Sequence, residues 1–369
     1  MQKELRVIIS GGGTGGHIFP AVSIANAIKS LRPDASILFV GASGRMEMQR
    51  VPAAGYEIVG LPIRGFLRPL WKPANVMVLL DYLKSKRMAK KILKQFSPQV
   101  AVGVGGYASS AALGAANSLG IPTLLQEQNS YAGLANKTLA KKAAVICVAY
   151  EGMERFFPAE KLMLTGNPVR QALLETTISR DDAARSLGFD PARKIVLLVG
   201  GSLGARTINQ SVLTQLDLIK SHPEVQFFLQ TGRYYYDSIK AQLQGETIPN
   251  LLVTDFITDM GAAYRTADLV VSRAGASSIS EFCLIGKPVI LVPSPNVAED
   301  HQTKNALALS DRGAAIYVKD SEAPSVLLPT AIDTVTDPHR LEQLSSNVRK
   351  LALPDSADII AKEVIKLAQ

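Results

Sequence analysis

Two stretches of this sequence decide its fold. Residues 5–16 read LRVIISGGGTGG, and residues 194–205 read KIVLLVGGSLGA. Each is a short apolar run that ends in a glycine-rich turn, after which the spacing of the apolar residues becomes helical. Continuous runs of Val, Ile and Leu are typical of strands buried on both faces of a parallel sheet, with helices on each side. The sequence therefore predicts an α/β protein with two Rossmann-like parallel-sheet domains.

Other apolar runs continue this alternation. The predicted strands are residues 5–10, 36–40, 100–104, 123–126 and 145–149 in the first half, and 194–199, 225–230, 251–255, 269–272 and 289–292 in the second. Gly166, Asn167 and Pro168 interrupt both patterns, so we expect domains of residues 1–165 and 166–349. The helix-like segment 357–368 could pack on either half, and we expect residues 350–369 to return to the first. Two such domains face each other across a cleft, with ligands at the carboxyl ends of the strands.

The composition is that of an ordinary globular protein. Of 369 residues, 47% are hydrophobic and 20% are charged, which excludes bulk disorder and a disulfide-stapled scaffold. Cys147 and Cys283 lie in apolar runs and are expected to be buried thiols. No Cys/His cluster predicts a zinc site. Neither a secretory leader nor a transmembrane helix is predicted, so we expect a soluble or peripheral cytoplasmic protein.

The net charge of +8 is concentrated in one segment. Between positions 60 and 95 there are nine basic residues and one acid, Asp81. Apolar side chains alternate with these bases, which suits the surface of an anionic membrane. An amphipathic core helix with a solvated basic face is the plainer alternative. The residues selected as a membrane patch are Phe66, Leu67, Arg68, Trp71, Lys72, Leu79, Leu80 and Lys84.

The first glycine loop satisfies the dinucleotide fingerprint with Gly11, Gly13 and Gly16. A dehydrogenase of this type should carry an acid at the end of its second strand, where this sequence reads FVGASGR up to Arg45. Arg45 could accept a 2′-phosphate, so an NADP-dependent oxidoreductase is one alternative. The glycines also offer backbone N–H groups beside a helix N-terminus, which suits an anion such as pyrophosphate. A tight turn without a ligand is the plainer alternative.

Further motifs follow other predicted strands. Residues 103–107 read GVGGY, residues 127–129 read EQN, residues 166–170 read GNPVR, and residues 272–281 read SRAGASSISE. With GGGTGGH at 11–17, these motifs resemble the MurG family in order and spacing over nearly the whole chain. The resemblance implies the two-domain GT-B glycosyltransferase fold. It also implies transfer of N-acetylglucosamine from UDP-N-acetylglucosamine to undecaprenyl-diphospho-N-acetylmuramoyl-pentapeptide, the lipid I to lipid II step of peptidoglycan synthesis.

The resemblance implies a donor site that lies mainly in the second domain. Glu281 would bind the ribose, because a carboxylate accepts hydrogen bonds from two vicinal hydroxyls at once. Ser202 and the turn formed by Ala276, Ser277, Ser278, Ile279 and Ser280 would hold the diphosphate. Arg170 and the backbone around Ile257 would line the nucleotide site. The expected sugar contacts are His301 and Gln302, together with Thr14, Gly15, Gly16 and Asn129 from the first domain.

The resemblance also implies an inverting, single-displacement reaction. His17 would be the base, and Glu127 its partner or a ligand of the acceptor sugar. The expected acceptor-binding residues are Gly12, Gly13, Gly105, Gly106 and Tyr107. The metal-binding pattern Asp-x-Asp is absent, so helix N-termini, Arg170 and hydroxyls would neutralise the leaving UDP without a metal or cofactor.

The expected partners are UDP-N-acetylglucosamine, a polyprenyl-diphosphate-linked acceptor, an anionic membrane surface and other cell-wall synthesis proteins. The expected location is the cytoplasmic face of the cell membrane. A glycolipid transferase with another acceptor is the nearest alternative. A nucleic-acid-binding protein is a third possibility. The bases of the 60–95 segment lie among aliphatic rather than stacking aromatic residues, which disfavours it.

Overall fold

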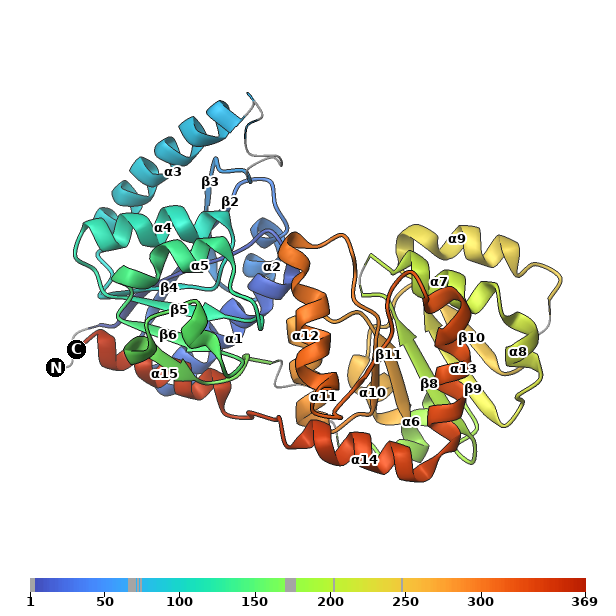
Figure 1. The fold of residues 1–369 in the computed structure, drawn as a ribbon. Coiled ribbons are helices and arrows are strands. Elements are labelled where there is room, and N and C mark those ends of the chain that lie inside the picture. The colour runs from blue at the N-terminus through green and yellow to red at the C-terminus, as the bar shows by residue number, and fades with distance from the viewer. Residues whose placement is uncertain are drawn as a thin grey trace. The chain divides into compact units, whose positions relative to one another are not determined.

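The chain folds into two compact units, each built on one parallel sheet (Figure 1). The computed structural model describes residues 4–65, 71, 73, 75–169, 177–201, 203–246 and 248–369. Unit 1 comprises Met1–Arg170 and Leu353–Gln369, and unit 2 comprises Gln171–Ala352. The chain therefore leaves unit 1 near residue 170 and returns to it near residue 353.

Unit 1 contains a sheet of seven strands. Its strands are β1 (Arg6–Ser10), β2 (Ser36–Ala42), β3 (Glu57–Leu61), β4 (Val100–Gly103), β5 (Thr123–Glu127), β6 (Val145–Val148) and β7 (Leu162–Leu164). Its helices are α1 (Gly15–Leu31), α2 (Glu47–Ala53), α3 (Asn75–Phe96), α4 (Tyr107–Ser118), α5 (Leu134–Leu139) and α15 (Ser356–Leu367). Three short 3-10 turns are η1 (Ala140–Lys142), η2 (Met153–Arg155) and η3 (Ala159–Lys161).

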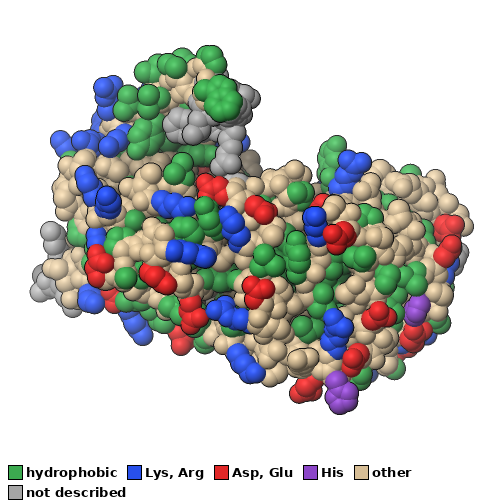
Figure 2. Space-filling model, in the orientation of Figure 1, with side chains coloured by type: hydrophobic (Ala, Val, Ile, Leu, Met, Phe, Trp, Pro, Cys, Tyr) green, Lys and Arg blue, Asp and Glu red, His purple; other side chains and the backbone are tan. Residues whose placement is uncertain are grey.

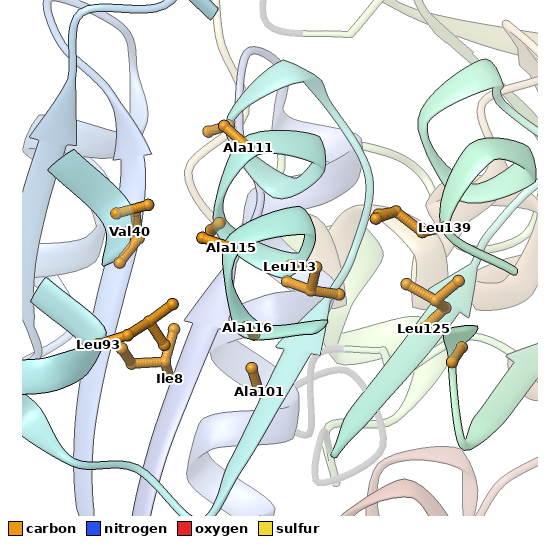
Figure 3. Packing of buried hydrophobic residues seen from close by; sticks show 14 of the residues in the cluster. Ile8, Val40, Leu93, Ala101, Ala111, Leu113, Ala115, Ala116, Leu125 and Leu139 are labelled. Carbon is orange, nitrogen blue, oxygen red and sulfur yellow. The ribbon is translucent and has the colours of Figure 1, made fainter. Parts of the chain in front are cut away.

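The core of unit 1 lies on both faces of its sheet. Along β1, Ile8 points into one layer, and Val7 and Ile9 point into the other, as the alternation of a strand requires. The layer of Ile8 is closed by alanines and leucines of α3, α4 and α5 (Figure 3). The opposite layer is closed by α1 and α15, which lie side by side in Figure 1. Helices that cover both faces explain why the strands are apolar throughout.

Unit 2 contains a sheet of six strands. Its strands are β8 (Lys194–Val199), β9 (Val225–Gln230), β10 (Leu251–Thr254), β11 (Leu269–Ser272), β12 (Val289–Leu291) and β13 (Ile316–Tyr317). Its helices are α6 (Arg180–Ser186), α7 (Arg206–Leu213), α8 (Leu216–Lys220), α9 (Arg233–Gln242), α10 (Met260–Thr266), α11 (Ala276–Ile285), α12 (His301–Ser310), α13 (Ala323–Thr336) and α14 (Pro338–Arg349). A 3-10 turn, η5 (Ala298–Asp300), precedes α12.

The two sheets share one topology. The strand order is β3-β2-β1-β4-β5-β6-β7 in unit 1 and β10-β9-β8-β11-β12-β13 in unit 2, and every pairing is parallel. Each order reverses at one point, between β1 and β4 and between β8 and β11. In open sheets of this kind, ligands bind at the carboxyl ends of the strands beside that point. The glycine loops that follow β1 and β8 lie there in both units.

All ten predicted strands are present, with ends that differ by up to two residues. The structure adds β3, β7 and β13, which sequence analysis missed. All three are edge strands, and none of their residues except Leu61 is fully buried. Strands on an edge need no continuous apolar run, so they lack the signal that identified the central strands.

Candidate active site

Two glycine loops of unit 1 pack directly against each other at the switch point of the sheet. A Cβ atom on Gly106 would lie 2.7 Å from the carbonyl oxygen of Gly12, and one on Gly105 would lie 2.9 Å from Nε2 of His17. Gly105 and Gly106 also have φ values of +95° and +87°, which disfavour any larger residue. The glycines of the GVGGY motif therefore keep the space around His17 open.

His17 lies in the first turn of α1 and is half-buried. Its Nδ1 atom is 3.0 Å from the carbonyl oxygen of Gly12 and 3.4 Å from the hydroxyl of Thr14. A carbonyl oxygen can only accept, so this contact favours the tautomer that carries its proton on Nδ1. The neutral ring then presents its lone pair on Nε2, as a general base requires.

Glu127 is the last residue of β5 and is only 2% exposed. Its Oε1 atom accepts from the backbone N–H of Asn129 at 3.1 Å and from the Asn129 side chain at 3.4 Å. Its Oε2 atom accepts from the N–H of Gly133 at 3.0 Å and from the side chain of Asn136 at 2.9 Å. The carboxylate thus folds the 128–136 loop around itself and sets the position of Asn129.

Three sequence motifs of unit 1 meet through amide side chains. Gln128 donates to the carbonyl of Val104, inside the GVGGY motif, at 2.9 Å. Asn167 of the GNPVR motif accepts from Gln126 at 2.9 Å and donates to the carbonyl of Gln128 at 3.0 Å. These residues are buried, so their hydrogen bonds fix the relative positions of the three loops.

The other predicted residues of unit 1 lie around this centre, and some of them are exposed. Gly13, Thr14 and Gly16 are exposed, whereas Gly12 is buried and Gly15 is half-buried. Tyr107 begins α4 and is 53% exposed, and its ring fills the space that a Cβ on Gly65 would occupy. The exposed part of the 11–16 and 104–107 loops is therefore the 13–16 segment and the ring of Tyr107.

In unit 2, the SRAGASSISE motif forms the end of β11, a turn and α11. Glu281, in the second turn of the helix, is 5% exposed and accepts from the hydroxyl of Tyr264 at 3.2 Å. It is therefore not a solvated surface carboxylate. In the first turn, the buried Ser277 hydroxyl has no hydrogen-bond partner among the described residues. Ser280 donates to the carbonyl of Ala276 at 3.1 Å. Ala276 and Ile279 are buried, and Ser278 is half-buried.

The loops that follow β8, β9 and β10 are joined by one side chain. Gln230 accepts from the N–H of Gly200 at 3.2 Å and donates to the carbonyls of Gly201 and Asp255 at 3.0 Å each. Ile257, two residues beyond Asp255, is 6% exposed. The backbone at Ile257 is thereby held near the second glycine loop.

His301 and Gln302 begin α12, directly after the η5 turn. Oε1 of Gln302 accepts from the N–H of Ser294 at 2.9 Å, which anchors the loop that follows β12. Asn305, one turn further along, is buried and donates to the carbonyl of Ala274 at 3.3 Å. The start of α12 is therefore fixed to the loop that follows β11.

Sequence analysis missed an ion pair that stabilises the loops at the carboxyl ends of β11 and β12 in unit 2. Arg273 contacts the carboxylate of Asp320 and donates to the carbonyls of Val292 and Pro293 at 3.0 and 3.1 Å. Asp320 also accepts from the hydroxyl of Thr207 at 3.0 Å. Arg273 lies inside a quoted motif, but Asp320 stands alone in the sequence, so only the fold reveals the pair.

Sequence analysis also missed Glu47, the first residue of α2. This carboxylate is fully buried and accepts from the N–H groups of Gly13 and Ala42 at 3.0 Å each. A Cβ on Gly12 would lie 2.1 Å from Oε1 of Glu47, so the glycine leaves room for the acid. The signal that could have identified Glu47 is its place in the sequence, five residues after the end of β2 and at the start of a helix.

Several predicted residues lie outside the described part of the chain: Phe66, Leu67, Arg68, Lys72, Arg170 and Ser202. Of the remaining membrane patch, Trp71 is 85% exposed, and Leu79 and Leu80 are about half exposed. Figure 2 shows hydrophobic side chains gathered over the N-terminal end of α3. Asp81, the one acid of this segment, pairs with Arg64 at 2.7 Å. Lys84 is exposed.

The described residues include neither a membrane-spanning helix nor a cluster of metal ligands. None of the helices described is both long enough and apolar enough to cross a membrane. Within the same residues, no three His, Cys, Asp or Glu side chains are grouped so as to hold a metal ion. Cys147 and Cys283 are both free and buried, as predicted.

Comparison with known proteins defines the class first. Residues 7–148 match the N-terminal domain of glycosyltransferase family 28, and residues 195–360 match its C-terminal domain. The crystal structure of Acinetobacter baumannii MurG superposes with a TM-score of 0.77 at 29% identity and covers 98% of this chain and 99% of that one. These matches, with the two parallel sheets, define a glycosyltransferase of the GT-B fold, as predicted.

The relatives then define the family. A Bacteroides fragilis protein named UDP-N-acetylglucosamine–N-acetylmuramyl-(pentapeptide) pyrophosphoryl-undecaprenol N-acetylglucosamine transferase is 65% identical over 368 residues, which are 99% of this chain and 96% of that protein. The protein of the same name from Bacteroides thetaiotaomicron is 64% identical and spans 100% of this chain and 99% of its own length. The chain belongs to the MurG family. Membership of this family argues against both the NADP-dependent oxidoreductase and the nucleic-acid-binding protein considered above.

Proposed function

We propose that this chain transfers N-acetylglucosamine from UDP-N-acetylglucosamine to the muramoyl-pentapeptide of undecaprenyl-diphosphate-linked lipid I, which forms lipid II. The observation that carries this proposal is the sequence identity of 63–65% to the family's transferases over almost the entire length of the chain. Such full coverage includes both units, and therefore the residues for donor and acceptor alike. The described loops at the carboxyl edges of both sheets agree with it.

Unit 2 supplies the donor site in this proposal. The first turn of α11 presents backbone N–H groups and the Ser277 hydroxyl, which has no hydrogen-bond partner in the described part of the chain, and both suit the diphosphate of UDP. Glu281, held by Tyr264, would accept from the ribose hydroxyls. Arg170, Ser202 and the backbone at Ile257 complete the proposed nucleotide contacts. The sugar contacts remain His301, Gln302, Thr14, Gly15, Gly16 and Asn129.

His17 is the proposed base, because its Nδ1 bond to Gly12 leaves the lone pair on Nε2. A hydroxyl of the acceptor sugar attacks the anomeric carbon of the donor and forms the new C–O bond. The bond from that carbon to UDP breaks, and UDP keeps its electron pair. The hydroxyl proton moves to Nε2 of His17. Attack from the face opposite the leaving group inverts the anomeric carbon.

Glu127 has a positioning role in this proposal. Both of its oxygens already accept hydrogen bonds from the loop that it organises, so it orients Asn129 rather than carrying the proton. Gly105, Gly106 and Tyr107 form the proposed acceptor site together with Gly12 and Gly13. The N–H of Gly13 already donates to Glu47, so the 11–13 segment would offer the acceptor open space rather than this donor.

We also propose that the chain works at the cytoplasmic face of the cell membrane as a peripheral protein. The acceptor carries a polyprenyl tail, so the enzyme must reach a bilayer surface. The exposed apolar residues at the start of α3 and the lysines and arginines after them suit that surface. Other cell-wall synthesis proteins are proposed as neighbours there.

A transfer assay tests the function. Purified protein receives UDP-N-acetylglucosamine with a labelled sugar and a short-chain lipid I analogue, with EDTA present. We expect transfer in the chelator, a fall in kcat of about 10²- to 10⁴-fold in His17→Ala, and a rise in KM for the donor of about tenfold or more in Glu281→Ala. His339→Ala and Glu342→Ala, both exposed on α14, are the matched controls.

Each other outcome has its own meaning. Transfer that requires an added divalent ion would refute the metal-free mechanism but keep the activity. UDP binding without any transfer to the lipid I analogue would refute this acceptor and favour a different glycolipid. Full activity in His17→Ala would remove His17 from the role of base.

A further inference from the structure

One peptide group joins the proposed base to a buried acid. The bond between Gly12 and Gly13 has its C=O on one side and its N–H on the other, as a planar trans amide does. The C=O accepts from Nδ1 of His17 at 3.0 Å, and the N–H donates to Oε2 of Glu47 at 3.0 Å. The order along this line is carboxylate, peptide, imidazole.

The carboxylate of Glu47 is fully buried and accepts a hydrogen bond at each oxygen. Glu47 has no exposed surface, and its other oxygen accepts from the N–H of Ala42 at 3.0 Å. The two glycines at 12 and 41 leave room for it, because a Cβ on either would lie within 2.6 Å of its side chain. A buried carboxylate is costly unless its oxygens are hydrogen-bonded, and the N–H groups of Gly13 and Ala42 meet that need, one at each oxygen.

We propose that Glu47 is a positioning residue that acts on His17 through the Gly12–Gly13 peptide. An ionised carboxylate on the N–H end polarises the amide and makes its carbonyl oxygen a stronger acceptor. The stronger acceptor holds the proton on Nδ1, keeps the lone pair on Nε2, and stabilises the imidazolium that forms when Nε2 takes the hydroxyl proton. A carboxylate does the same by direct contact in other enzymes, where it fixes the tautomer of a catalytic histidine.

This proposal rests on the proposed role of His17 as base, and its test has a readout that does not depend on activity. The chain has four histidines. Full-length protein labelled with 15N in histidine therefore gives few ring signals, and the His17 signals are those that disappear in His17→Gln. At about pH 8, above the usual histidine pKa of about 6.5, the spectrum reports which ring nitrogen carries the proton.

The key variant is Glu47→Gln, which keeps the size of the side chain and one acceptor oxygen but removes the charge. We expect the wild-type protein to carry the His17 proton on Nδ1. In the variant, we expect a measurable fraction of molecules to carry it on Nε2 instead. We also expect kcat for transfer to fall about 10- to 100-fold, with KM for UDP-N-acetylglucosamine within about twofold of wild type. Glu57→Gln, which removes an exposed carboxylate from the start of β3, is the control for net charge.

The outcomes separate this inference from the proposed function. A wild-type His17 protonated on Nε2 would overturn the inference, and this measurement stands even if Glu47→Gln does not fold. Unchanged kcat and an unchanged tautomer in a folded Glu47→Gln would show that Glu47 only shapes the loop. If the tautomer shifts as expected while His17→Ala keeps full transfer activity, the relay exists but the proposed base is wrong.

Discussion

Lys287 shows how a single residue can couple the stability of unit 2 to pH. It follows Gly286, which ends α11 in the left-handed conformation, and its ammonium donates to the carbonyls of Ala267 and Arg265. Burial lowers the pKa of Lys287 to about 8 from 10.5, and the nearby Asp268 offsets only part of this. Between about pH 8 and pH 10.5, Lys287 binds more protons in the unfolded chain than in the folded one. Its contribution to the free energy of unfolding therefore rises with pH across this range.

Replacement of this lysine should remove that dependence. We expect the free energy of unfolding of wild type relative to Lys287→Met to increase by about 2 kcal/mol between about pH 7 and about pH 10. Urea unfolding of both proteins at several pH values measures the difference. Lys350→Met, exposed just after α14, is the matched control and should show no such trend. A constant difference across the range would contradict the buried position of the Lys287 ammonium.

The candidate site could be predicted in part, and the residues show why. His17, Glu127 and Glu281 stand in glycine-rich or amide-rich motifs at strand ends, where the sequence itself marks a site. Glu47 and Asp320 do not stand in such motifs. Their hydrogen-bond partners are backbone groups or residues that are distant in the sequence, and only the fold brings them together. Gly12 and Gly41 are evident in the sequence, but the sequence does not show that they leave room for the side chain of Glu47.

At the scale of the element, α3 is the part of unit 1 that sets membrane affinity in our proposal. Its first half exposes Val76, Met77, Leu79, Leu80 and Leu83, and its second half is basic. We expect the double variant Lys84→Ala with Arg87→Ala to bind anionic vesicles about 30-fold more weakly, at about 1 kcal/mol for each basic residue. Vesicle sedimentation at fixed salt concentration measures the binding.

The control for α3 is a pair of exposed bases on another helix. Arg340→Ala with Lys350→Ala removes the same charge at and just beyond α14 and should leave vesicle binding close to wild type. Equal losses in the two double variants would show that net charge, rather than α3, drives the binding. Leu79→Ser with Leu80→Ser should lower binding to neutral vesicles as well, because it removes apolar contact.

At the scale of the whole molecule, the central strands followed from apolar runs alone, whereas our expectation that residues 350–369 return to the first domain did not follow from the apolar spacing. An amphipathic segment after residue 350 could have covered either sheet. The structure places Ile360, Ala361 and Val364 against α1 and the layer of Val7 and Ile9. Which of two similar apolar faces a helix covers depends on packing over long sequence distances, and periodicity does not report it.

The core of unit 1 should therefore depend on a residue from the far end of the sequence. Ile360 is fully buried, so Ile360→Ala should lower the free energy of unfolding of unit 1 by about 2–4 kcal/mol. Hydrogen exchange of peptides from β1 and β4 should become faster, while peptides from β8 and β11 keep their wild-type protection. Faster exchange in both sets would show that the two units unfold together.

The return of the chain to unit 1 also has a consequence during synthesis. The layer closed by α1 cannot be completed until residues 356–367 have left the ribosome, after all of unit 2. At about 5–20 residues per second, unit 2 (residues 171–352) takes about 10 to 40 s to translate. During that interval the apolar side of β1 and α1 has no permanent cover, while unit 2 can fold to completion. We therefore expect a ribosome-associated chaperone to bind the nascent chain during this interval.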